Sequence, residues 1–223
     1  KRVDFINYWL YTFTATCLLC LVEPFVAIWL GQDFVLTKAI LILAVAIYYF
    51  KGINSGIDIA KNAAGLYYPD RFIPMAEAIA NMVISIVLAK RYGIAGVLFG
   101  TLVSFLALSF WAKPYFVCRD VFEVSFARYA VREGREIVVS VLVAAGTWYA
   151  VSLVSLENVL LSFGVKALLA LALSNGLLLL VYFKTSEFQY LRGLLESAAR
   201  RKIPLVIGTT GFSDAQGEAI REA

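Results

Sequence analysis

The sequence predicts an all-α membrane protein, a polytopic bundle of about six transmembrane helices. Hydrophobic residues make up 61% of its 223 residues and charged residues only 16%, whereas an average soluble domain is about half apolar and about a quarter charged. Three stretches, residues 94–112, 137–156 and 167–183, contain no charged residue. About 18 such residues are enough to cross the ~30 Å hydrocarbon core of a bilayer. The runs are continuous, without the alternation of barrel strands, so helices are the expected spanning elements.

Breaks between the apolar runs divide the chain into six expected spans. They cover residues 9–30, 39–59, 72–88, 94–115, 137–156 and 159–183. With six spans, both ends of the chain lie on the same side of the membrane. If that side is the cytoplasm, 16 of the 20 Lys and Arg residues lie inside, and the 4 outside are Lys38, Lys90, Arg91 and Lys166. Because cytoplasmic loops carry the excess of basic residues, the count predicts that both ends are cytoplasmic.

The chain divides into three expected parts. Residues 1–184 form the six-helix membrane unit, residues 185–202 a cytoplasmic amphipathic helix, and residues 203–223 a short tail. A second amphipathic stretch, residues 120–135, interleaves aromatic residues with arginines at helical spacing. This pattern is typical of a helix that lies flat in the membrane interface. The alternative for the amphipathic segments is a solvated connecting helix.

Small residues indicate where helices approach closely. Gly52 and Gly56 form one G-x-x-x-G pattern, and Gly96 and Gly100 form another; in lipid this pattern permits tight helix contact. A C-x-x-C begins at Cys17 inside an apolar stretch, where packing is the favoured interpretation and redox or metal chemistry the alternative. The chain has no histidine, which excludes imidazole triads, proton relays and His metal sites. We expect neither a metal nor a cofactor.

The second expected span carries a polar stripe. Its members recur every three or four residues and therefore share one helical face: Lys51, Asn54, Ser55, Asp58, Lys61 and Asn62. A charge near the bilayer centre costs at least ~2.5–3.5 kcal/mol on insertion scales, so the stripe predicts a water-filled cavity. Its lysines would attract a pyrophosphate or an acidic sugar. The alternative places Asp58 and Lys61 at the cytoplasmic helix end, where they are solvated.

Two further carboxylates lie at membrane depth. Glu23 precedes Pro24, which frees a backbone carbonyl beside it, so the pair predicts a cation or proton site; the alternative is that Glu23 contacts water at the outer interface. Glu77 forms a polar line with Asn81 and Ser85 at i, i+4 and i+8. Possible ion-coupling residues are thus Glu23, Asp58 and Glu77. Arg71, in a cytoplasmic turn, and Asn81 complete the expected cavity lining.

Several short motifs resemble a known transporter family. They occur in order between residues 7 and 115: Asn7-Tyr-Trp-Leu-Tyr11, Glu23-Pro24-Phe25, Ile28-Trp-Leu-Gly31, Ala64-Gly-Leu-Tyr-Tyr-Pro-Asp-Arg71, Pro74-Met-Ala-Glu-Ala78, Asn81, Ser85-Ile86, Gly93-Ile-Ala-Gly-Val97, Gly100-Thr101, Trp111 and Lys113-Pro114. In order and spacing they are similar to the later membrane spans of bacterial Wzx-type polysaccharide flippases. These belong to the multidrug/oligosaccharidyl-lipid/polysaccharide exporter superfamily.

The resemblance implies a function and partners. Family members move undecaprenyl-diphosphate-linked oligosaccharides across the bacterial cytoplasmic membrane by alternating access between two six-helix lobes, without chemistry on the substrate. This chain would be the later lobe, and its expected partners are the lipid-linked oligosaccharide, membrane lipids and a missing N-terminal lobe, with no nucleic acid. Where the family often has an arginine one turn after Lys51, and an Arg-Asp pair near Lys61, this chain has Asn54 and Lys61-Asn62.

Two other functions remain as alternatives. One is a drug or small-molecule exporter of the same superfamily. The other is a membrane glycosyltransferase or polymerase component, against which the short outer connections argue. The longest outer connection, residues 31–38, has about eight residues, whereas such enzymes need an acidic catalytic pair or a large outer loop.

The last 21 residues follow a different pattern. Residues 203–207 have the pattern of a short strand, and Ser213 with Gln216 fits a capping box that opens a helix. The loop between them, Gly208-Thr-Thr-Gly-Phe212, resembles a fragment of dihydrodipicolinate reductase. A G-x-x-G-x-x-G opening is missing and the family's catalytic histidines cannot exist here, so reductase activity is not expected. A strand without a sheet partner is expected to be poorly ordered.

Overall fold

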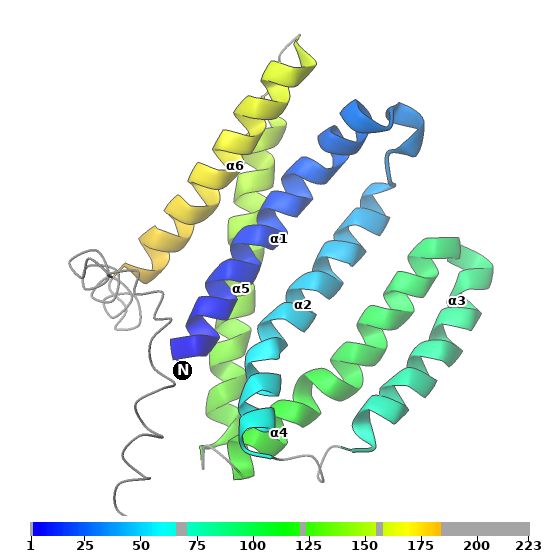
Figure 1. Ribbon diagram of the computed structural model, residues 1–223, viewed down its shortest axis with the longest axis vertical. Helices are drawn as coiled ribbons and strands as arrows, with labels where there is room; N and C mark the ends of the chain where they lie inside the picture. The colour runs from blue at the N-terminus through cyan, green and yellow to red at the C-terminus, as the bar shows by residue number, and fades with distance from the viewer. Residues whose placement is uncertain (1, 66–70, 121–123, 155–157, 184–223) are drawn as a thin grey trace, which may run out of the picture. The chain divides into compact units, whose positions relative to one another are not determined.

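The computed structural model describes residues 2–65, 71–120, 124–154 and 158–183, and every regular element in these ranges is helical. The order is α1 (Arg2–Trp29), the short 3₁₀-helix η1 (Gln32–Phe34), α2 (Lys38–Ala63), α3 (Ile73–Ser104), the π-helix η2 (Phe105–Ser109), α4 (Phe110–Asp120), α5 (Phe126–Ser152) and α6 (Val159–Tyr182) (Figure 1). The predicted amphipathic helix of residues 185–202 and the tail of residues 203–223 lie outside the described residues.

Within the described residues, five continuous helical stretches are long and apolar enough to cross a membrane. The predicted all-helical class is confirmed, and its helices have the length and composition of membrane spans. Many large apolar side chains point outward: Leu168 is 69% exposed and Leu180 is 80% exposed. A soluble protein rarely exposes so much contiguous apolar surface. In a bilayer these side chains contact lipid.

The longest stretch, Ile73–Asp120, is a helical hairpin rather than one rod. It reverses at Gly93, whose φ of 58° and ψ of −134° lie outside the helical region and favour glycine. Contacts pair Leu88 with Gly96 and Ser85 with Gly100, so the two arms run antiparallel, as Figure 1 shows. We refer to residues 73–92 as the first arm and residues 94–120 as the second arm. They correspond to the expected spans at 72–88 and 94–115.

The second arm continues beyond its predicted end at residue 115. Its helix runs to Asp120 through Pro114, which lacks the N–H needed for the usual helical bond. Residues 105–109 form one wider π turn, in which the Phe110 N–H bonds to the Phe105 carbonyl. A π turn inserts one extra residue and rotates the side chains that follow.

The predicted flat interfacial helix at residues 120–135 is wrong. Residues 126–152 form one continuous helix, α5, so the basic segment is the first part of a long helix. The reason is that Arg132 turns inward: its Nη2 lies 3.4 Å from the Asp4 Oδ2 and its Nε lies 3.7 Å from the Glu136 Oε1. Asp4 is available because α1 begins at Arg2, seven residues before the predicted start at residue 9.

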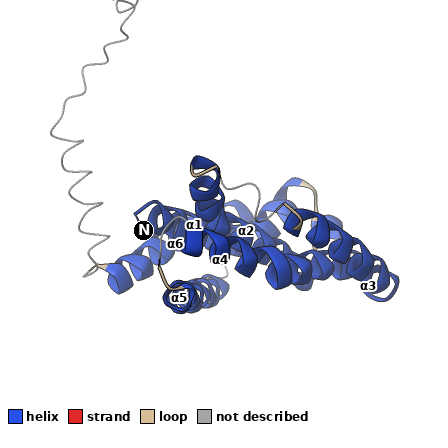
Figure 2. Cartoon of the chain, turned by 90° about the horizontal axis from the view of Figure 1, so that it is seen from below, coloured by secondary structure: helices blue, strands red, loops and turns tan. Residues whose placement is uncertain are grey.

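Helices α2, α5 and α6 all contact α1. The contacts Asp4–Arg132 and Thr12–Ser140 have the same offset of 128 residues, so α1 and α5 run parallel. Helix α6 runs antiparallel to α1, because Trp9 donates to Asn175 while Phe25 packs on Phe163. Figure 2 shows α5 on one side of the layer that contains α1 and α2.

Both G-x-x-x-G predictions are confirmed as close helix contacts. A Cβ atom on Gly52 would lie 2.1 Å from the Tyr11 ring of α1, and one on Gly56 would lie 3.1 Å from the Asp4 Oδ1. A Cβ atom on Gly96 would lie 2.4 Å from the Leu88 carbonyl oxygen across the hairpin. The absence of a side chain at these glycines lets the neighbouring segments approach this closely.

Candidate functional site

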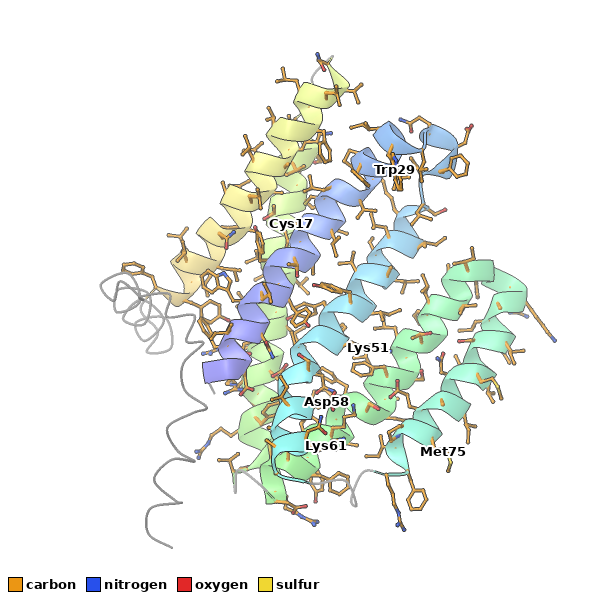
Figure 3. The ribbon with its side chains drawn as sticks, in the orientation of Figure 1. Cys17, Trp29, Lys51, Asp58, Lys61 and Met75 are labelled. Carbon is orange, nitrogen blue, oxygen red and sulfur yellow. The ribbon has the colours of Figure 1, made fainter. Side chains whose placement is uncertain are left out.

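The polar stripe of α2 divides between two neighbouring helices. Figure 3 shows Lys51, Asp58 and Lys61 in order along the lower half of α2. One part of the stripe faces α1, where the Asn7 Nδ2 donates to the Ser55 Oγ at 3.4 Å and the same hydroxyl donates to the Gly52 carbonyl. Ser55 therefore holds α1 against α2, and the predicted bond between Lys51 and Ser55 is not present.

The other part of the stripe faces the second arm of the hairpin. The Lys113 Nζ donates to both carboxylate oxygens of Asp58, at 2.9 and 3.2 Å. The Lys51 Nζ lies 5.7 Å from the centre of the Phe105 ring. The predicted pairing of Asp58 with Lys61 or Asn62 is therefore wrong, because the lysine that pairs with Asp58 comes from the neighbouring helix. We name Lys51, Asn54, Asp58 and Lys113 the α2 patch.

Asn54 is the unusual member of the α2 patch. It is 3% exposed, and neither its Oδ1 nor its Nδ2 has a hydrogen-bond partner among the described residues. It lies three residues after Lys51 and four before Asp58, so it shares their face of α2. Leaving a buried polar group unpaired costs about 1–3 kcal/mol. Asn54 is therefore a buried amide with unused hydrogen-bonding capacity on the helix face that carries Lys51 and Asp58.

The carboxylate line of the third expected span has a different environment. Glu77, Asn81 and Ser85 do share one face, as predicted, and that face meets the second arm. The Ser109 hydroxyl donates to Glu77, and the Ser85 and Thr101 hydroxyls both donate to the Asn81 Oδ1, at 2.8 and 3.2 Å. We name these contacts the hairpin seam. Glu77 and Asn81 therefore join the two arms of the hairpin, and their predicted place on a cavity wall stays a prediction.

Arg71 and Lys61 lie at the ends of their helices. Arg71 is exposed just before α3, with its guanidinium carbon 4.6 Å from the centre of the Phe72 ring. Lys61 is partly buried in the last turn of α2, one turn after Asp58. The structure thus brings Lys61 near the α2 patch and leaves Arg71 on the surface.

Glu23 lines a cavity that the sequence did not reveal. The cavity has a volume of about 460 Å³ and is lined by α1, α2 and α5. Glu23 and Lys38 stand at one end of it, near Trp148, and Thr12, Tyr49 and Ser140 stand at the other. The Lys38 Nζ lies 5.9 Å from the Trp148 ring centre. Of the site residues predicted from the sequence, Glu23 alone is on its wall.

A second charged cluster, formed by Asp4, Arg132, Glu133 and Glu136, was not predicted from the sequence. Its residues have the pattern of a surface segment. Arg132 contacts Asp4 and Glu136 as described above, and both Glu133 and Glu136 are 7% exposed. The sequence feature that could have indicated this cluster is the i, i+4 spacing of Arg132 and Glu136 directly before an uncharged run. No group of three metal-ligating side chains lies close enough to bind an ion within the described ranges. The cluster therefore serves as an ionic contact between α1 and α5.

Comparison with known proteins adds no relative. Searches found no family model, no curated protein and no solved structure that match this chain.

Proposed function

We propose that this chain is part of a transporter that moves an undecaprenyl-diphosphate-linked oligosaccharide across the bacterial cytoplasmic membrane, without chemistry on it. In this proposal the hairpin crosses the membrane twice, which makes six spans with both ends in the cytoplasm. The observation that carries the proposal is the α2 patch, in which exposed Lys51 and the ion pair of Asp58 with Lys113 share one face of α2 with a buried amide that has no partner among the described residues. The sequence resemblance to Wzx-type flippases supports it.

The α2 patch has the chemistry to recognise a diphosphate. Lys51 offers a cation that has an aromatic ring but no carboxylate beside it among the described residues. Lys113 offers a second cation that is neutralised by Asp58. A phosphate that binds Lys113 competes with Asp58, and the released carboxylate then takes up a proton or cation. Ion uptake and substrate binding are thereby linked through one ion pair, as reciprocal coupling requires.

Neutralising the cations of the α2 patch tests the proposal. In the chromosomal gene of the source organism, Lys51→Gln and Lys113→Gln should each reduce surface polysaccharide at least tenfold per molecule of protein present in the membrane. The matched control is Lys90→Gln, an exposed lysine near the hairpin turn, which should have no effect. Normal polysaccharide in both Lys51→Gln and Lys113→Gln would refute the site.

The lipid-linked intermediate distinguishes transport from synthesis. A blocked flippase leaves undecaprenyl-diphosphate-linked sugar accumulated in the inner leaflet, whereas a blocked glycosyltransferase depletes it. We expect accumulation in the Lys113→Gln strain, measured by extraction and mass spectrometry of the lipid fraction. Depletion would favour the glycosyltransferase alternative.

A further inference from the structure

The cavity between α1, α2 and α5 is a separate feature from the α2 patch. Helix α1 packs along both α2 and α5, while α2 and α5 meet through the Tyr49 hydroxyl, which donates to the Ser140 Oγ at 2.8 Å. On one side of this contact the helices leave the cavity of about 460 Å³. It extends along α1 from Thr12 to Glu23, which at 1.5 Å per residue is about 16 Å.

The hydroxyl groups on the wall are already hydrogen-bonded. Thr12 and Ser140 share a bond of 2.7 Å, and Thr16 donates to the Thr12 carbonyl at 2.8 Å. Ser140 also donates to the Glu136 carbonyl. These side chains therefore present carbon to the cavity, beside residues such as Leu19 and Val45. Water gains little from such a wall, and an empty space would deprive the wall of dispersion contacts.

The two charges at the cavity end are available to a ligand. Among the described residues, Glu23 and Lys38 form no ion pair with each other or with a third residue, and the Lys38 ammonium lies 5.9 Å from the centre of the Trp148 ring. A carboxylate and an ammonium that line the same cavity complement a headgroup that carries one ammonium and one phosphate. Lys38 suits the phosphate and Glu23 suits the amine.

We infer that this cavity binds one acyl chain of a zwitterionic aminophospholipid, with the headgroup held between Glu23 and Lys38. The apolar length accepts the chain, and the unpaired charges fix its orientation. The bound lipid fills the gap that α2 and α5 leave and so joins the two helices. This inference needs the chain to lie in a membrane and does not depend on what the chain transports.

Photolabelling tests the site directly. The 223-residue chain is reconstituted into bilayer discs that contain phosphatidylethanolamine with a diazirine in the middle of one acyl chain, irradiated, and mapped by peptide mass spectrometry. We expect the cavity-lining residues within 12–23, 38–50 and 137–148 to be labelled several-fold more than Leu168 and Leu180, which face outward on α6. Uniform labelling of all outward-facing helices would overturn the inference.

Filling the cavity provides the matched comparison. Ala144→Trp places an indole in the cavity, and Ala172→Trp places the same group on the exposed face of α6. Ala144→Trp should reduce cavity labelling at least fivefold and Ala172→Trp should leave it unchanged. If Ala144→Trp does not fold, judged by circular dichroism, the smaller change Val141→Phe replaces it. Equal labelling in a folded cavity variant would contradict the inference.

A separate experiment tests which lipid headgroup binds between Glu23 and Lys38. Glu23→Gln should weaken retention of phosphatidylethanolamine several-fold relative to phosphatidylglycerol, because the amine loses its carboxylate. Native mass spectrometry of the purified protein measures the retained lipids. An unchanged ratio of the two lipids would refute the zwitterionic assignment.

Discussion

The hairpin seam and the α2 patch are both polar contacts inside apolar helices, and they differ in how their hydrogen-bonding groups are used. In the seam, Asn81 accepts from two hydroxyls and Glu77 accepts from Ser109. In the patch, Asn54 is more deeply buried than Glu77 or Asn81 and has no hydrogen-bond partner among the described residues. A satisfied polar contact in lipid joins helices. An unsatisfied one costs stability and is explained by a ligand.

The largest effect on stability is expected where the two arms of the hairpin approach most closely. Gly96→Ala would place a methyl group 2.4 Å from the Leu88 carbonyl oxygen, and the backbone there cannot move without opening the hairpin. We expect a loss of about 3 kcal/mol in unfolding free energy, measured by thermal unfolding in detergent. Gly176→Ala, where nothing lies within 4 Å, is the control and should stabilise α6 by about 0.5–1 kcal/mol.

Breaking the ion pair of the α2 patch should have a smaller effect. Asp58→Leu leaves Lys113, whose side chain is 16% exposed, without its partner. Loss of one partner from a fully buried pair costs about 3–5 kcal/mol. Because Asp58 is 38% exposed, solvent reduces the expected cost to about 2 kcal/mol. The double variant Asp58→Leu/Lys113→Leu should recover most of this loss, and a double variant as unstable as the single one would contradict the pairing.

The two asparagines provide the closest comparison. Asn81→Leu removes an acceptor of two hydrogen bonds in the seam and should cost about 1 kcal/mol, a typical value for bonds between membrane helices. In a double-mutant cycle with Thr101→Val, the double variant should lose less unfolding free energy than the sum of the two single variants, because both remove the same hydrogen bond. A fully additive cycle would mean that the bond between Thr101 and Asn81 contributes nothing.

Asn54→Leu is expected to change stability least. Its amide makes no bond that could be lost, and leucine of similar size removes an unsatisfied polar group. The unfolding free energy should stay within about 0.5 kcal/mol of the wild type or rise. A loss above about 1 kcal/mol would show that Asn54 has a structural partner.

The sequence predicted the class of fold, and which side chains share a helical face, better than it predicted which residues of other helices those side chains contact. The face shared by Glu77, Asn81 and Ser85 follows from helical periodicity. Ser109, the partner of Glu77, lies 32 residues further along the chain, and its direction depends on the Gly93 turn and the π turn. Neither the turn angle nor the extra residue of a π turn can be read from an apolar run.

The charged residues show the same limit more clearly. Lys113 and Arg132 read as side chains that reach the membrane interface, because each adjoins an apolar run. The partner of Lys113 is Asp58, 55 residues away, and the partner of Arg132 on another helix is Asp4, 128 residues away. Pairings between helices depend on packing, which a single sequence does not specify. The cavity between α1, α2 and α5 was missed for the same reason, since it exists only where α2 and α5 separate.

The most direct test measures transport and stability together in the two asparagine variants. Our account predicts that Asn54→Leu keeps wild-type stability and protein level but loses surface polysaccharide, with lipid-linked sugar accumulating. Asn81→Leu should be less stable and should retain transport in proportion to the folded protein that remains. If Asn54→Leu transports normally while Asn81→Leu loses transport beyond its loss of protein, the polar site would lie in the hairpin seam and the central claim would be wrong.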